Sequence, residues 1–169
     1  MKNIILIGFM ACGKSSVGRR LSQALDLEFL DTDELIEQKA GITIADIFAT
    51  QGEAAFRTME TECLKDLLNR DSGTFVLSVG GGLPIREENR KLLSQIGEVI
   101  YLKVSAETVF IRVRNDTTRP LLQTQNPRGR IMDLMGARKQ FYEDAADYVL
   151  EADNKSFDTI IEEIKEICG

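Results

Sequence analysis

The fold is decided by Gly8-Phe9-Met10-Ala11-Cys12-Gly13-Lys14-Ser15, which satisfies the phosphate-loop pattern G-x-x-x-x-G-K-[ST]. An apolar, β-branched run at residues 3–7 precedes this stretch, and apolar residues at helical spacing follow it over residues 16–25. Glycines let the backbone curl so that successive N–H groups face a phosphate, and the following helix adds its dipole. We therefore expect a strand, a P-loop and a helix that bind a nucleoside triphosphate. The alternative is a plain glycine turn with an exposed lysine.

Each position of this loop has an expected task. Lys14 would reach the β- and γ-phosphates, and the Ser15 hydroxyl would ligate Mg²⁺. Cys12 is expected to be a small filler whose amide matters, and the alternative is a reactive thiol. The residues expected to contact ATP in this region are Ala11, Cys12, Gly13, Lys14, Ser15 and Ser16.

Composition bounds the rest of the chemistry. A chain of 169 residues fits one domain, and 21 Lys+Arg against 27 Asp+Glu give a net charge of −6. That sign disfavours nucleic-acid and anionic-membrane partners. The sequence has no histidine, which excludes a Ser-His-Asp triad and a His-ligated metal. Three widely spaced cysteines suggest reduced thiols in the cytoplasm, and we expect neither a secretory signal nor a transmembrane segment.

Short apolar runs alternate with helical patterns along the chain, which indicates an α/β protein whose parallel sheet is covered on both faces. The expected strands are 3–7, 29–30, 75–79, 98–104 and 148–150, and the expected helices are 16–25, 34–39, 43–50, 53–69, 106–113, 130–146 and 157–167. The one long irregular segment is 115–129, a length at which loops are usually functional.

Two carboxylates end the second expected strand. Asp31 and Asp33 are separated by one residue, and the carboxyl ends of strands in an open α/β sheet face the ligand crevice. One carboxylate would hold Mg²⁺ through water, and the other would accept the proton or hydrogen bond of an acceptor hydroxyl. The alternative is that Asp33 only caps the next helix while Asp31 is solvated.

Two arginines interrupt apolar helix faces. Arg138 lies in the apolar row of the 130–146 helix, where a guanidinium needs an anion. Arg57 shares a row with Glu60, so a structural ion pair between the two is an equal alternative to a functional role. If both arginines are functional, they form a clamp for a small carboxylate.

Glycine and proline mark two further candidate segments. Gly80-Gly81-Gly82 follows an apolar strand, so a ligand can approach the backbone there; a flexible turn is the alternative. The segment 115–129 carries Arg119, which could close over a triphosphate, and a solvated surface loop is the alternative.

The guanine-specifying N-K-x-D pattern fails at Asn154-Lys155-Ser156-Phe157, which lacks the final Asp, and this favours a kinase over a switch GTPase.

These residues together resemble the shikimate kinases, and the resemblance covers essentially the whole chain. It rests on an ordered set of motifs: GFMACGKSSVG at 8–18, DTD at 31–33, GEAAFRTME at 52–60, SVGGG at 78–82, REENRKLL at 86–93, TRPLL at 118–122 and ARKQFYEDAADYV at 137–149. The family phosphorylates the 3-hydroxyl of shikimate with ATP and Mg²⁺ on the path to chorismate.

The resemblance implies a role for each matching residue. Lys14 resembles the lysine on the transferred phosphate, Ser15 the direct Mg²⁺ ligand and Asp31 the second-sphere one. Asp33 resembles the residue that binds the acceptor hydroxyl and acts as base. The implied shikimate contacts are Asp33, Arg57, Gly80, Gly81, Gly82 and Arg138, and the implied nucleotide contacts outside the loop are Arg112, Arg119 and Lys155.

The implied architecture is the nucleoside-monophosphate-kinase type of P-loop fold, a three-layer α/β sandwich. It has five parallel strands in the order 2-3-1-4-5, one kinase domain over 1–169, a substrate-binding region around 33–60 and a lid around 115–129. Two departures stand out, because Ala11 replaces a usual glycine and Leu83-Pro84 replaces a usual Ala-Val. The resemblance implies a monomer; a kinase for another hydroxy acid such as gluconate and a non-catalytic ATP-binding relative are the alternatives.

Overall fold

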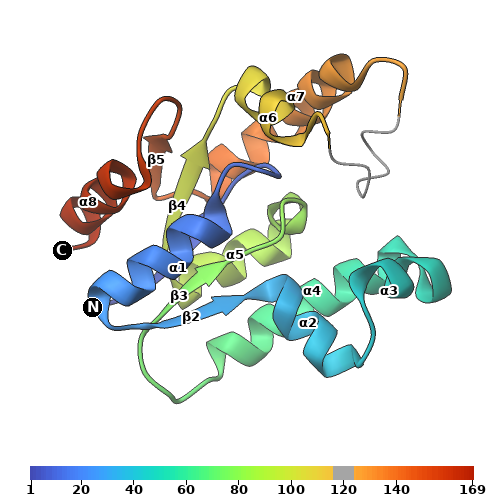
Figure 1. Ribbon diagram of the computed structural model, residues 1–169. Coiled ribbons are helices and arrows are strands. Elements are labelled where there is room, and N and C mark those ends of the chain that lie inside the picture. The colour runs from blue at the N-terminus through green and yellow to red at the C-terminus, as the bar shows by residue number, and fades with distance from the viewer. Residues whose placement is uncertain (116–123) are drawn as a thin grey trace.

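A five-stranded parallel sheet forms the centre of the molecule (Figure 1). The structure is a computed structural model, and it describes residues 1–115 and 124–169. The strand order is β2-β3-β1-β4-β5, and every neighbouring pair is parallel, as expected from the resemblance. The strands are β1 (Asn3–Ile7), β2 (Glu28–Asp31), β3 (Phe75–Ser78), β4 (Gly97–Lys103) and β5 (Tyr148–Glu151).

Helices cover both faces of this sheet (Figure 1). Helices α1 and α8 pack against each other on one face, and α5 and α7 lie on the other face, where α4 packs on α5. The described helices are α1 (Lys14–Leu25), α2 (Thr32–Ala40), α3 (Ile44–Gln51), α4 (Glu53–Leu68), the 3-10 turn η1 (Leu83–Ile85), α5 (Glu87–Ile96), α6 (Ala106–Val113), α7 (Pro127–Ala145) and α8 (Phe157–Cys168). The prediction of a three-layer α/β sandwich is confirmed.

The core lies around the central strand. The four residues from Ile4 to Ile7 in β1 are fully inaccessible to solvent, and β3 is buried along its whole length. A strand covered on both faces needs apolar residues at consecutive positions rather than in alternation, which is the pattern of these two segments. Because burial excludes alternative registers, the sheet holds the loops at its carboxyl edge in fixed places.

Two helical segments differ from the sequence-based expectation. Helix α5 and the η1 turn were not expected. In α5, the first half of the helix is charged and the apolar residues lie only in its second half, so its helical pattern is weak. Helix α7 begins at Pro127 rather than at residue 130, since the Asn126 side chain accepts from the Gly129 amide and proline suits a first helical position. Residues 127–129 are therefore helical and do not belong to the expected irregular segment 115–129, of which 116–123 lie outside the described residues.

The sheet brings three loops to one edge. The P-loop follows β1, Asp31 ends β2, and the glycine strip Gly80–Gly82 follows β3. Because the strands are parallel neighbours in the order β2-β3-β1, their carboxyl ends meet side by side. Within residues 1–115 and 124–169, no helix combines the length and the apolar character that crossing a bilayer requires.

Candidate active site

The P-loop uses three residues in backbone conformations that favour glycine. Gly8 and Gly13 have φ values of 152° and 96°, and Ala11 has a φ of 58°. A Cβ atom in this left-handed region is strained by about 1 kcal/mol. Ala11, which replaces the family's usual glycine, therefore keeps the backbone path of the loop at a cost in stability.

Lys14 lies across the inside of this loop. Its Nζ donates to the carbonyls of Gly8 at 2.9 Å and Phe9 at 3.0 Å, and lies 3.6 Å from the Cys12 Sγ. The Cys12 side chain is 3% exposed, which agrees with its predicted role as a filler, and its amide donates to the Phe9 carbonyl at 3.2 Å. The ammonium group is thus held beside the turn where a phosphate would be cradled.

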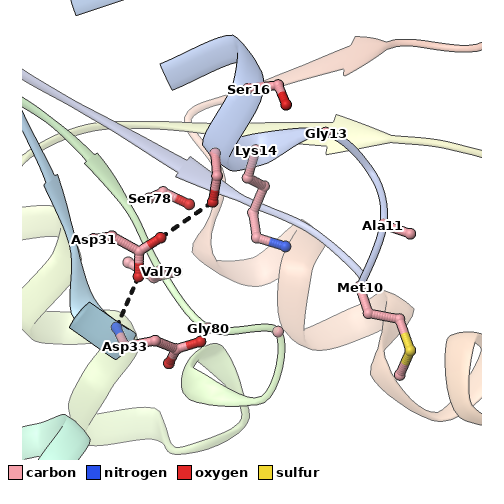
Figure 2. Close-up of a pocket in the computed structure, with 12 residues that line it drawn as sticks. Met10, Ala11, Gly13, Lys14, Ser16, Asp31, Asp33, Ser78, Val79 and Gly80 are labelled. Atoms are coloured by element: carbon pink, nitrogen blue, oxygen red, sulfur yellow. Dashed lines mark hydrogen bonds between the residues drawn. The ribbon is translucent and has the colours of Figure 1, made fainter. Parts of the chain in front are cut away.

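Asp31 connects the P-loop helix to helix α2 (Figure 2). Its Oδ2 accepts from the Ser15 hydroxyl at 3.1 Å, and its Oδ1 accepts from the amides of Asp33 at 2.8 Å and Glu34 at 3.4 Å. Asp31 is therefore the N-cap of α2. The alternative in which Asp33 caps the helix is wrong, because the helix begins at Thr32 and the aspartate immediately before it supplies the cap.

This capping leaves the Asp33 carboxylate free to face the cleft. In Figure 2 it points from the first turn of α2 toward Gly80. The expectation that both carboxylates end the second strand is wrong for Asp33, since the strand ends at Asp31 and Asp33 is helical. Burial, followed by the neighbouring charge of Asp31, raises the pKa of Asp33 from 3.8 to about 6. A partly buried carboxyl group with a raised pKa is suited to accept a proton from a bound hydroxyl.

The glycine strip forms the opposite wall of the cleft. Gly80 lies close to two carboxylates. A Cβ atom added to Gly80 would be 3.0 Å from Asp33 Oδ1 and 3.1 Å from Glu60 Oε2. Gly81 lies between the P-loop and Arg138, with its Cβ position 3.6 Å from the Met10 amide and 3.7 Å from Arg138 Nη1. The missing side chains let protein groups lie close to the strip. Approach of a ligand to this backbone stays a prediction.

Arg57 lies against the third glycine of the strip. A Cβ on Gly82 would be 2.6 Å from Arg57 Nη1. The guanidinium pairs with Glu60 Oε1 at 2.7 Å and with Glu53 Oε1 at 3.3 Å. The structural ion pair that was weighed against a functional Arg57 therefore exists, and the paired guanidinium lies against Gly82.

Glu60 is a functional candidate that the sequence interpretation did not single out. Its side chain is fully buried, and its Oε2 has no hydrogen-bond partner in the described structure. Burial raises the pKa of Glu60 from 4.5 to about 7, and the hydrogen bond from Arg57 opposes this rise. The available signal was the spacing of three residues from Arg57, which places both side chains on one helix face.

Arg138 approaches the glycine strip from helix α7. It is half-buried, and its guanidinium carbon lies 5.8 Å from the centre of the Phe9 ring. Among residues 1–115 and 124–169, no carboxylate pairs with it within 4.0 Å. Arg57 is therefore paired with glutamates, whereas Arg138 lies beside Gly81 without a carboxylate partner among the described residues.

The two expected adenine-side residues have different partners in the structure. Arg112 lies beside the P-loop and donates to the Ala11 carbonyl at 2.7 Å. Lys155 instead pairs with Glu163 of α8 at 2.9 Å. Phe157 lies near the loop, since a Cβ on Gly13 would be 3.6 Å from its ring, and was not singled out from the sequence. Arg119 lies outside the described residues.

A pocket of about 310 Å³ joins the P-loop to the acceptor side. Its lining combines P-loop residues with both aspartates and the glycine strip: Met10, Ala11, Gly13, Lys14, Ser15, Ser16, Asp31, Asp33, Ser78, Val79, Gly80 and Gly81. Figure 2 shows Lys14 and Asp33 on opposite sides of it. A phosphate on the loop and a hydroxyl beside Asp33 would thus face each other across one space.

Comparison with known proteins identifies this arrangement. A family model described as shikimate kinase matches residues 10–168. The chain belongs to the shikimate kinase family. A shikimate kinase from Thioalkalivibrio sulfidiphilus is 43% identical over 162 residues, covering 96% of this chain and 84% of the relative, and one from Legionella pneumophila is 45% identical over 153 residues, covering 90% and 86%.

A solved structure agrees with the family assignment. Shikimate kinase from Acinetobacter baumannii, solved in complex with shikimate, superimposes with a TM-score of 0.91 at 39% identity and covers 99% of this chain and 93% of that one. As a member of the shikimate kinase family, the chain is a small-molecule kinase that uses ATP. The fold and family expected from the motif order are thus confirmed.

Proposed function

We propose that this chain transfers the γ-phosphoryl group of ATP to the 3-hydroxyl of shikimate, a step toward chorismate, and that the residues of the cleft divide the work as follows. The observation that carries the assignment is the meeting of Lys14, Asp33 and Gly80–Gly81 around one pocket in a member of the shikimate kinase family. Positioning and charge stabilisation supply most of the rate enhancement in phosphoryl transfer.

The P-loop and its helix would bind the triphosphate. The Lys14 ammonium neutralises charge on the transferred group, and the loop amides with the α1 N-terminus hold the neighbouring phosphates. Arg112, beside Ala11, and Lys155 are proposed to contact the nucleotide at its adenine end. Arg119, from the segment outside the described residues, is proposed to add positive charge to the transferred group.

Mg²⁺ would bind beside Ser15 and Asp31. Their Oγ and Oδ2 atoms lie 3.1 Å apart at the P-loop, and both are oxygen donors of the kind that Mg²⁺ prefers. In the described ranges, no group of three His, Cys, Asp or Glu side chains could hold a metal ion, so phosphate oxygens and water would complete its coordination. When bound, Mg²⁺ supplies charge neutralisation at the phosphates.

Asp33 would take the hydrogen bond of the acceptor hydroxyl. Its carboxylate faces Gly80, and the pKa of about 6 leaves it mostly ionised at neutral pH while keeping it a better base than a solvated aspartate. As the hydroxyl oxygen attacks phosphorus, its proton passes to an Asp33 oxygen. The triphosphate and the acceptor are then aligned by opposite walls of the pocket.

Arg57 and Arg138 would hold the carboxylate of shikimate. Both guanidinium groups lie against the glycine strip, Arg57 at Gly82 and Arg138 at Gly81. Glu60 fixes Arg57 through a 2.7 Å ion pair, whereas Arg138, which pairs with no carboxylate in the described part of the chain, would be available to an anion. The strip adds backbone N–H groups to this anion site. Residues 33–60 would thus form the substrate-binding region of a single kinase domain, with 115–129 as its lid.

We further propose that one chain is sufficient for activity and that the protein acts in the cytoplasm. All residues assigned above come from one chain, and Cys12, Cys63 and Cys168 are free thiols, as expected in a reducing compartment. Gel filtration of the active enzyme tests the first point, because activity confined to a dimer fraction would contradict it.

The function is tested by measuring ADP release with shikimate, quinate, gluconate and nucleoside monophosphates as acceptors. We expect turnover with shikimate to exceed that with every other acceptor. Turnover with gluconate equal to that with shikimate would favour the alternative hydroxy-acid kinase. Tight ATP binding without ADP release on any acceptor would favour a non-catalytic relative.

A further inference from the structure

The backbone of the glycine strip is anchored at both ends by side chains. The Gly80 amide donates to Thr32 Oγ1 at 3.1 Å, and the Gly81 carbonyl accepts from the Tyr142 hydroxyl at 2.6 Å. Turn hydrogen bonds occupy the remaining carbonyls, with Leu83 N donating to Gly80 at 3.1 Å and Ile85 N donating to Gly82 at 3.2 Å. Within the described ranges, the amides of Gly81 and Gly82 are left without an acceptor in the protein.

Tyr142 is buried where its hydroxyl reaches the Gly81 carbonyl, with the Arg138 charge nearby. It is 1% exposed, and its ring packs against Tyr101 of β4 with ring centres 5.1 Å apart. Burial raises the pKa of the Tyr142 phenol well above its ordinary value of 10, against the opposing effect of Arg138, so the hydroxyl stays protonated and can donate to a carbonyl. A hydrogen bond of 2.6 Å from a buried, rotationally fixed ring is a rigid tether.

The tether fixes more than one atom. The peptide between Gly81 and Gly82 is planar and trans, so its N–H points opposite to its carbonyl. Holding the Gly81 carbonyl therefore also sets the direction of the Gly82 N–H, next to the guanidinium of Arg57. Without this hydrogen bond the peptide could rotate more easily, because glycine adopts positive and negative φ values about equally well.

The position of Tyr142 on α7 adds a second link. It lies one helical turn after Arg138, whose Nη1 is 3.7 Å from the Cβ position of Gly81. The same helix thus supplies the guanidinium that borders the strip and the hydroxyl that orients it. Displacing α7 would move both together.

We propose that Tyr142 is a positioning residue, which holds the Gly81–Gly82 peptide so that the strip offers a preset N–H donor to the acceptor substrate, with Thr32 anchoring the other end of the strip. This inference rests on the proposed function, since it concerns the acceptor side of the same cleft. It predicts that loss of the tether weakens the acceptor and leaves the nucleotide unaffected, because the P-loop amides do not depend on Tyr142.

Tyr142→Phe tests the inference, with Tyr101→Phe as the matched control. Tyr142→Phe removes one oxygen and keeps the ring packing, so we expect the KM for shikimate to rise about 5- to 10-fold, the effect of one lost hydrogen bond. The KM for ATP should stay within about twofold, and Tyr101→Phe should leave both values near those of the wild type. The rise in melting temperature on adding shikimate should shrink for Tyr142→Phe alone.

A second pair of variants probes the other anchor. Thr32→Val removes the hydroxyl that accepts from Gly80, and Thr32→Ser restores it. We expect Thr32→Val to raise the KM for shikimate selectively and Thr32→Ser to return it to within about twofold of the wild type. If Tyr142→Phe proves unstable, the two Thr32 variants still test whether anchoring of the glycine strip sets the KM for shikimate.

The inference is overturned if Tyr142→Phe leaves the KM for shikimate unchanged, or if it raises both KM values equally. An equal rise would mean that the tyrosine only supports the fold. If the wild type phosphorylates shikimate and Tyr142→Phe has the same KM for shikimate, this inference is refuted and the proposed function is not. Wild-type enzyme that releases no ADP with shikimate would refute the proposed function, and this inference with it.

Discussion

The Oδ1 atom of Asp31 accepts a hydrogen bond from the backbone amide of Asp33 at 2.8 Å. Through this contact, one aspartate starts helix α2 and thereby places the carboxylate of the other in the cleft. The two residues have different roles, because Asp31 is turned toward Ser15 and the P-loop, and Asp33 is turned toward Gly80.

Separate substitutions of Asp31 should distinguish its capping role from its proposed metal role. Asp31→Asn keeps a capping oxygen and removes the charge, so we expect unchanged stability but a higher Mg²⁺ concentration for half-maximal activity. Asp31→Ala should also lose about 1 kcal/mol of stability. Thr43→Ala, which removes the cap of α3, is the matched control: it should lose stability without changing the Mg²⁺ demand. An equal Mg²⁺ shift in Thr43→Ala would contradict the metal assignment.

Lys14→Ala should lower kcat by at least ~10²-fold, because it removes the positive charge aimed at the transferred phosphate. The fold should persist, since only the hydrogen bonds to the Gly8 and Phe9 carbonyls and the weaker one to Cys12 Sγ are lost. Circular dichroism and ADP release measure the two effects. Lys91→Ala, at an exposed lysine paired with Glu87, should keep full activity. Near-normal turnover of Lys14→Ala would rule out its proposed role.

Arg138→Ala should raise the KM for shikimate by roughly 10- to 100-fold while changing the KM for ATP little, because a hydrogen bond to a charged group is lost. Arg138→Lys should recover only part of this loss, since lysine lacks the planar fork. Arg70→Ala, which breaks an ion pair with Glu28 away from the cleft, serves as the control. Equal changes in both KM values would show that Arg138 does not hold the carboxylate.

Glu60 should make stability depend on pH. Its pKa is raised from 4.5 in the unfolded chain to about 7 in the folded one, so the folded state holds the proton more tightly. The contribution is fully present below pH 4.5 and is lost as pH rises toward and through 7. Arg57, Asp33 and Arg86 are the charged neighbours of this carboxyl group.

Comparing the wild type with Glu60→Gln isolates this effect, because the other titrating groups, Asp33 included, remain in both proteins. Denaturant melts at pH 5, 6, 7 and 8 should show wild-type stability falling relative to that of Glu60→Gln as pH rises. A difference between the two proteins that is constant with pH would mean that Glu60 is ionised throughout this range.

Ala11→Gly should stabilise the protein by about 1 kcal/mol, because glycine adopts the φ of 58° without strain. For a chain of this size, the expected rise in melting temperature is roughly 2–4 °C. Ala24→Gly, at an exposed position inside α1, is the matched control and should destabilise by a similar amount. A loss of stability in both variants would show that the loop is unstrained.

Local patterns predicted much of this architecture. The bounds of β1 and α6 agree with the expected ranges 3–7 and 106–113, because an unbroken apolar run and a short amphipathic helix are visible in neighbouring residues. Helix α5 escaped prediction, since its first half is charged and only Leu92, Leu93 and Ile96 mark the buried end. The motif order, in turn, indicated the family that the comparisons confirm.

Other features of the site depend on contacts between distant segments. Which aspartate caps α2, and therefore which one faces the acceptor, follows from the place where the helix starts relative to the P-loop. The sequence marked Arg57 and Glu60 as a possible pair, but only packing shows that the pair lies against Gly82.

The sequence by itself determined the P-loop, the alternation of strands and helices, and the chemical groups available for phosphoryl transfer, because each of these is written in residues that are near neighbours along the chain. Tertiary structure alone decided the tether between Tyr142 and Gly81, 61 positions apart, and the buried, half-paired state of Glu60. The physical reason is that hydrogen bonding and desolvation depend on what surrounds a group in space, and the sheet assembles those surroundings from segments that no local pattern relates.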